Sequence, residues 1–249
     1  MPDLAPPFLA FAFLTFCLAG LVKGVTGMGL PTVAMGLLAA VMPPATAAAL
    51  LLLPSLVTNL WQLAAGPDPL GAVRRFWPMM AGVAVATTAA AGALSGDDAR
   101  LASAALGGVL ALYAALGLSG WRPTLRERAG RRLAAPVGLV TGAVTGATGV
   151  FVIPAVPYLQ ALGLEKEELV QALGLSFTVS TLALGAGLAL HGGLPAPAIG
   201  GSAAALIPAG LGMAAGTKLR RVIAPETFRT LFFAGLLALG LYLAATAAG

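Results

Sequence analysis

Lys23 is the residue of this sequence best suited to binding an anion. It is the only formal charge between Asp3 and Asp68, and the residues on both sides of it are largely apolar. A lysine at the centre of a membrane-spanning helix costs roughly 2.5–3.5 kcal/mol on insertion scales. An ammonium group kept there and facing a cavity would bind an anionic substrate. The alternative is that Lys23 extends from a helix end to the lipid head groups.

The phrase that contains Lys23 is rich in glycine and occurs twice. Residues 20–29 read GLVKGVTGMG, and residues 138–149 read GLVTGAVTGATG. Alignment of the first glycines pairs Lys23 with Thr141, and one inserted residue then pairs the Thr-Gly dipeptide at 26–27 with that at 145–146. A duplicated, glycine-interrupted apolar segment indicates a secondary transporter whose substrate binds where the two repeats meet.

Glycine and threonine suit a bend in the chain inside a membrane. Backbone groups that leave a helix there need partners, glycine allows positive φ angles, and threonine hydroxyls bond freed backbone groups. The N–H groups that start the next helix carry partial positive charge, so two such starts would form an anion site. Close helix packing is the alternative role for the glycines. The predicted substrate-binding residues are Lys23, Gly24, Thr26, Gly27 and Gly29 in the first copy, Thr141, Thr145, Gly146, Thr148 and Gly149 in the second, and Asn59, Ser180 and Thr181 on the following helices.

The composition is that of a polytopic membrane protein. Of the 249 residues, 59% are hydrophobic and 9% are charged, which leaves too little polar surface for a soluble globule. The net charge of +5 comes from arginines in short loops, so it indicates topology and not nucleic-acid binding. A single cysteine and a single histidine exclude a disulfide framework and a Cys/His metal cluster, and we expect no cofactor. Apolar segments lie at about 8–42, 44–65, 76–95, 99–120, 133–163, 168–190, 195–217 and 227–248.

The basic loops predict the topology. The positive-inside rule places residues 121–132 and 218–221 in the cytoplasm, so an even number of crossings separates them. Segment 133–163 must then cross zero times or twice, which predicts a hairpin of two short helices with the glycine phrase at its tip. Segment 8–42 has the same form. The acidic turn at 97–98 and both termini fall outside the cell.

These inferences predict an all-α polytopic membrane fold built from two inverted-topology repeats. Residues 1–120 form the first repeat, 121–132 a basic cytoplasmic linker, and 133–249 the second repeat. Each repeat consists of a broken-helix hairpin and three transmembrane helices. Whether the hairpins are re-entrant or fully spanning is open.

The ordered duplication resembles the TauE/SafE family of sulfite and sulfonate exporters. The resemblance rests on two glycine-threonine phrases followed by Pro31 and Pro154, on the helices after them at 45–53 and 170–180, and on the basic central loop. It covers nearly the whole chain. It implies a multi-pass protein of a cell inner (plasma) membrane or an organellar membrane that exports sulfite, sulfoacetate or a related sulfonate.

We therefore expect a secondary transporter, not an enzyme, that exports a small organosulfur anion by alternating access around the two tips. An intramembrane enzyme would need paired carboxylates or a Cys/His set, and the acids here lie in loops or at the ends of segments. A non-transporting membrane scaffold is the third class, and it would not need a buried lysine. The expected partners are the anion and the lipid bilayer, with no nucleic acid. Proton coupling as against uniport, and a homodimer formed through small-residue faces such as 185–187, are left open.

Overall fold

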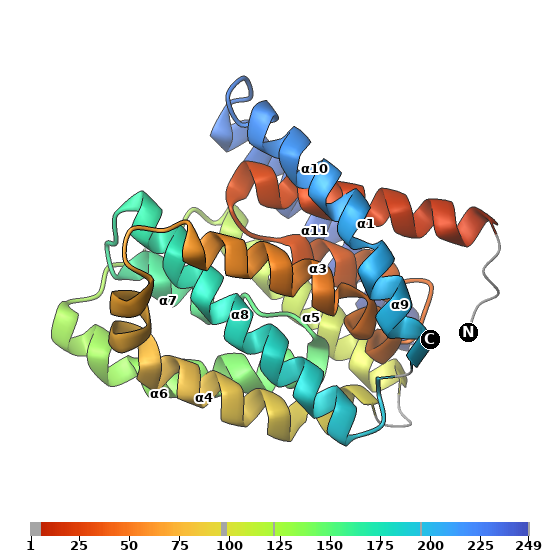
Figure 1. The fold of residues 1–249 in the computed structure, drawn as a ribbon, viewed down its shortest axis with the longest axis horizontal. Coiled ribbons are helices and arrows are strands. Elements are labelled where there is room, and N and C mark those ends of the chain that lie inside the picture. The colour runs from red at the N-terminus through yellow and green to blue at the C-terminus, as the bar shows by residue number, and fades with distance from the viewer. Residues whose placement is uncertain (1–5, 96–98, 122, 195, 249) are drawn as a thin grey trace.

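The computed structural model describes residues 6–95, 99–121, 123–194 and 196–248, which form α-helices and connecting turns with no strand (Figure 1). The helices are α1 Pro6–Thr26, α2 Leu30–Ala39, α3 Pro44–Ala64, α4 Pro69–Ser95, α5 Ala99–Leu118, α6 Glu127–Thr148, α7 Ala155–Ala161, α8 Lys166–Leu190, α9 Ala196–Ala204, α10 Leu206–Leu219 and α11 Pro225–Ala248. Each expected apolar segment corresponds to one or two of these helices. The acidic turn at 97–98 lies outside the described residues.

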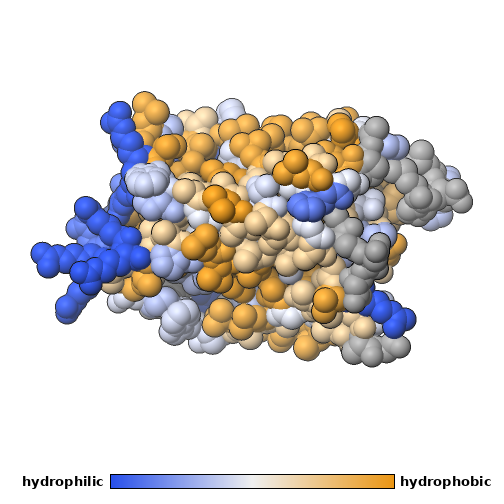
Figure 2. Space-filling model, turned by 90° about the horizontal axis from the view of Figure 1, so that it is seen from below, coloured by the Kyte–Doolittle hydropathy of each residue, from blue (hydrophilic) through white to orange (hydrophobic). Residues whose placement is uncertain are grey.

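The exterior of the molecule matches a membrane protein. Within the described residues, seven helical stretches are long and apolar enough to cross a bilayer, namely α1, α3, α4, α5, α8, Pro197–Leu219 and Glu226–Ala247. Figure 2 shows a broad hydrophobic band between two ends, with hydrophilic residues gathered most densely at one of them. The expected all-α polytopic membrane fold is confirmed.

The first hairpin has one long and one short arm. Helix α1 has 21 residues and ends at Thr26, and α2 has only 10 residues. Gly27 and Gly29 make the turn between them with φ angles of 80° and 97°, a region that a residue with a Cβ atom rarely adopts. Pro31 lies in the first turn of α2, where its missing N–H leaves no helical bond unmade.

The second hairpin repeats this asymmetry. Helix α6 has 22 residues and α7 has seven, and Gly149 ends α6 with a φ of 71°. The expectation of two short helices in each hairpin is therefore wrong for the first arm of both. The expected linker at 121–132 is also partly helical, because α6 begins at Glu127 and includes the last basic residues of that stretch. The length of an apolar segment indicates only the part of a helix that lies in the hydrocarbon layer. A helix that continues into a basic surface layer is longer than its apolar segment.

Glycines join the first arm of each hairpin to a helix of the other half. A Cβ atom on Gly20 or Gly212 would collide with a backbone carbonyl across the contact between α1 and α10. The same holds between α6 and α4, where a Cβ on Gly142 would lie 2.6 Å from the carbonyl oxygen of Val83. Small residues let helix backbones approach closely in membranes. The packing role considered for these glycines is thus present in the structure.

Most of the large helix contacts are related by an exchange of the two halves. Helix α1 packs on α10 as α6 packs on α4, α3 packs on α8, and α5 packs on α11. The contact of α4 with α8 is as large as that of α3 with α8, but its counterpart between α10 and α3 is small. Figure 1 shows α4 and α6 side by side along one edge of the molecule. Exchange of α1 with α6, α3 with α8, α4 with α10 and α5 with α11 maps each of these four pairs onto another or onto itself. The inverted repeat stays a prediction, and this pairing favours it.

Candidate functional site

Lys23 lies inside the protein, close to the end of α1. Its side chain is 2% exposed, and its Nζ donates a hydrogen bond to Oδ1 of Asn59 on α3. Among the described residues the one ion pair joins Arg131 and Glu127, so no carboxylate neutralises Lys23. Two residues expected to share the site are thus in contact. A membrane-embedded ammonium with one neutral partner retains two N–H donors and an uncompensated charge.

Several buried polar side-chain atoms of the described residues have no hydrogen-bond partner. Asn59 itself is fully buried, and its Nδ2 has no acceptor. The other buried side-chain atoms without a hydrogen-bond partner are the hydroxyls of Thr32, Ser55, Thr87, Thr141, Ser176 and Ser180 and Oε1 of Gln62. Buried polar groups are normally satisfied, so an unpaired set points to a ligand or to water. Helices α3 and α8, which pack together, carry most of the set.

The first tip is held by side chains that satisfy its backbone. The hydroxyl of Thr26 lies 2.9 Å from the carbonyl oxygen of Val22 and 2.7 Å from that of Met28, and it accepts a hydrogen bond from the N–H of Met28 at 3.2 Å. Gln62 on α3 donates from Nε2 to the carbonyl oxygen of Gly27 at 2.6 Å. Thr26 therefore has the backbone-bonding role expected for a threonine at the tip.

The second tip has the same local structure at Thr148, not at Thr145. Thr148 donates to the carbonyl oxygen of Val144 at 2.7 Å and accepts from the N–H of Val150 at 3.3 Å. The capping bonds also correspond, since the N–H of Gly27 bonds to the carbonyl of Lys23 and that of Gly149 to the carbonyl of Thr145. The structural counterpart of Thr26-Gly27 is thus Thr148-Gly149.

This correspondence corrects the alignment made from the sequence. Lys23 corresponds to Thr145 and Gly24 to Gly146, so the pairing of Lys23 with Thr141 is wrong. The second phrase contains three Thr-Gly dipeptides, and the middle one, Thr145-Gly146, preserves more of the letters around Thr26-Gly27 than Thr148-Gly149 does. Only the end of the helix shows which of them makes the turn.

The remaining expected site residues fall into three groups. Gly24 and Gly146 lie within helices, and a Cβ on Gly146 would be 2.6 Å from the carbonyl oxygen of Thr87, so both contact a neighbouring helix. Thr145 and Thr181 are buried and donate back to their own helices at 2.7 Å. Two further residues, Thr141 and Ser180, are buried and keep unpartnered hydroxyls.

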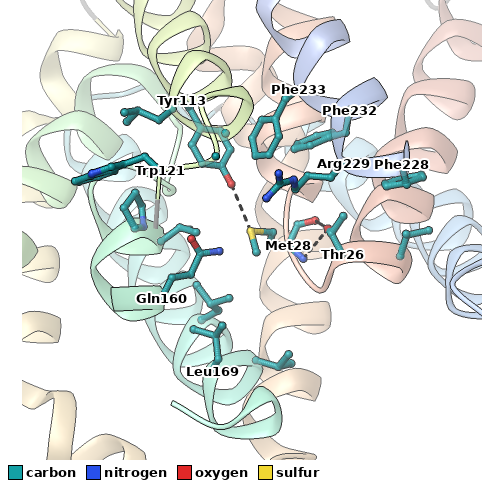
Figure 3. A pocket seen from close by; sticks show the side chains of 18 of the residues that line it. Thr26, Met28, Tyr113, Trp121, Gln160, Leu169, Phe228, Arg229, Phe232 and Phe233 are labelled. Carbon is teal, nitrogen blue, oxygen red and sulfur yellow. Dashed lines mark hydrogen bonds between the residues drawn. The ribbon is translucent and has the colours of Figure 1, made fainter. Parts of the chain in front are cut away.

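A cavity of about 730 Å³ leads to the first tip from the basic end of the molecule. Thr26 and Met28 form part of its lining, together with residues of α5, α7, α8 and α11 (Figure 3). The hydroxyl of Tyr113 on α5 donates to Sδ of Met28 at 3.4 Å across the cavity. Lys23 does not line this basic-end cavity. Lys23 is buried three residues before Thr26 on the same helix.

The second tip is enclosed. Val150, Phe151 and Val152 are each at most 1% exposed. A cavity of about 350 Å³ at the opposite end is lined by residues 39–44, the start of α5 and the end of α11, and by no residue of the second tip. The two tips thus differ in access, although their hydrogen bonds match.

The sequence did not predict the walls of the basic-end cavity. Met28, Tyr113, Gln160, Arg229 and Phe232 line it and were not expected at the site. The available signal was the spacing of Phe228, Arg229, Phe232 and Phe233, which places an arginine and three phenylalanines within little more than one helical turn.

Comparison with known proteins gives a family match over nearly the whole chain. The family model described as "Sulfite exporter TauE/SafE" matches residues 12–243. Searches of curated proteins and of solved structures found no significant match.

Proposed function

Because the chain belongs to the TauE/SafE sulfite exporter family, we propose that it exports a small organosulfur anion, such as sulfite, sulfoacetate or a related sulfonate, by alternating access around its two tips. It does so as a multi-pass protein of the cell inner membrane. The positive-inside rule assigns the basic end, with the larger cavity, to the cytoplasm.

The observation that carries this proposal is the buried, unneutralised Lys23. A cation at that depth is costly unless an anion joins it. The substrate supplies the missing negative charge, and the free Nδ2 of Asn59 donates a second hydrogen bond to its oxygens. Asn59 thus has two roles, because its Oδ1 also holds the ammonium group in place.

The difference in access between the two tips supports entry of the anion from the cytoplasm as the first step of transport. An anion from the cytoplasm reaches Thr26 and Met28 through the basic-end cavity, while the second tip is closed. Displacement of the first tip admits the anion to Lys23, and opening of the second tip releases it outside. A negative-inside membrane potential favours this exit by about 2.3 kcal/mol per charge per 100 mV.

Proteoliposome flux tests the proposal. Purified protein should release trapped radiolabelled sulfite or sulfoacetate, Lys23→Ala should abolish this flux, and Lys23→Arg should retain part of it. Lys218→Ala is the matched control, because it removes an exposed lysine at the end of α10. Normal flux in a folded Lys23→Ala protein would show that Lys23 does not bind the anion.

A further inference from the structure

The basic-end cavity contains an arginine that no acid neutralises. Arg229 on α11 is half-buried, and its side chain points into the cavity toward Met28 and Tyr113 (Figure 3). Glu226 lies one turn earlier on the same helix, yet it forms no ion pair with Arg229 in the described structure. The guanidinium group is therefore free to bind an anion from the cavity.

Aromatic rings form the wall next to this guanidinium. Tyr113 and Phe233 meet edge to face with ring centroids 5.2 Å apart, and Phe232 stacks obliquely on Phe233 at 5.0 Å. The other charged residues that line the cavity are Lys166 and Arg220, both exposed at its mouth, and no acid is among the described lining residues. The cavity is thus positive and apolar at the same time.

We propose that Arg229 and these rings form a second anion-binding site, on the cytoplasmic side of the first tip, for an organic sulfonate with an apolar body. The forked guanidinium binds two sulfonate oxygens at once, and the apolar body packs against the rings of Tyr113, Phe228 and Phe232. The identity of the head group rests on the proposed transport function. The cavity volume of about 730 Å³ falls within the roughly 300–1,000 Å³ of sites for small organic ligands, far more room than an inorganic sulfite ion needs.

This site is distinct from Lys23. Arg229 lines the basic-end cavity, whereas Lys23 is buried and does not, so an organic sulfonate binds first at Arg229 and then moves to the buried lysine. The competing explanation is that Arg229 is only a topology signal, like other arginines at the cytoplasmic end. That explanation does not account for the direction of the Arg229 side chain into the cavity. It also predicts that substitution of Arg229 and of the exposed Arg221 has the same effect on anion binding.

Calorimetric titration of the full-length protein in detergent with benzenesulfonate tests the proposal. The Lys23→Ala variant removes the central site, and we expect it to retain one binding site. The double variant Lys23→Ala with Arg229→Gln should bind benzenesulfonate about 10- to 100-fold more weakly, the range expected for lost hydrogen bonds to a charged group. Added Arg221→Gln removes the same charge outside the cavity and should leave the affinity unchanged.

The aromatic wall has its own readout. Phe232→Ala should reduce the preference for benzenesulfonate over methanesulfonate roughly 2- to 10-fold, because an aromatic contact is lost. If Arg229→Gln does not fold, Arg229→Lys replaces it, and the loss of the forked geometry should still weaken binding. Unchanged affinity in the Arg229 variant, or loss of all binding in Lys23→Ala, would overturn the second site. Absence of flux in the unmodified protein would instead contradict the transport function, and the titrations would still decide the site.

Discussion

Substitution of Asn59 by leucine should destabilise the protein by leaving Lys23 without a partner. Leucine is close to asparagine in size, so the change removes the hydrogen bond to Nζ without opening a large cavity. Both residues are almost fully buried, so the ammonium group is not in contact with bulk water that could replace the lost acceptor. Loss of a hydrogen bond to a charged group costs about 1.5–3 kcal/mol, which lowers the melting temperature of a chain of this size by roughly 3–12 °C.

The paired substitution Lys23→Met with Asn59→Leu separates stability from function. Replacement of a buried polar pair by apolar residues of similar volume is often neutral, so the double variant should melt within ~4 °C of the unmodified protein. It should still transport nothing, because the anion-binding charge is absent. Melting curves in detergent and flux in proteoliposomes provide the two measurements. If the double variant is destabilised by the sum of the effects of the two single substitutions, Lys23 and Asn59 are not coupled and the reasoning fails.

Two further predictions concern helix packing and topology. Gly212→Ala should destabilise the protein by about 1–3 kcal/mol through overpacking, since its Cβ would collide with the carbonyl of Cys17. Gly210→Ala on the same helix is the control and should be neutral, because a Cβ there meets open space. Equal melting temperatures of the two variants would contradict the close contact of α1 with α10. In a Cys17→Ser background, a cysteine in place of Arg100 should react with a membrane-impermeant reagent from outside and one in place of Lys218 only from the cytoplasm. Cytoplasmic labelling of position 100 would rule out the inverted topology.

The existence of the two tips could be predicted from the sequence. Gly27, Gly29 and Gly149 adopt positive φ angles that a chain reversal inside an apolar segment needs, and glycine is the residue that permits them. Lys23 and Asn59 were both expected at the site, but their direct hydrogen bond was not predicted. The existence of the tips follows from local chemistry.

The register of the second tip and the lengths of the hairpin arms could not be predicted. Thr145-Gly146 and Thr148-Gly149 carry the same local signal, and the packing of α6 on α4 decides that the helix continues to Thr148. The division of 133–163 likewise depends on where α6 begins, and arginines on its first turns extend it beyond the apolar stretch. The register of the tip and the lengths of the arms result from tertiary contacts, and the composition of a segment does not reveal those contacts.

The walls of the basic-end cavity depend on residues far apart in the chain. Tyr113 and Phe233 meet only because α5 packs on α11. Arg229 in the sequence is one of several basic residues near an apolar helix. Its spacing from Phe228, Phe232 and Phe233 is a local signal, but its direction into the cavity is seen only in the folded chain.

The glycine contact between α1 and α10 also constrains how the protein can be made. Helix α1 leaves the ribosome first, but the surface that receives Gly20 and Gly24 is synthesised roughly 190 residues later. At about 5–20 residues per second, this delay amounts to roughly 10–40 s. During that interval the lysine-bearing helix lacks its final neighbour, whereas α6 meets α4 as soon as it emerges. The nascent first helix therefore needs a temporary companion, either lipid or an insertion factor, until the ribosome has nearly finished.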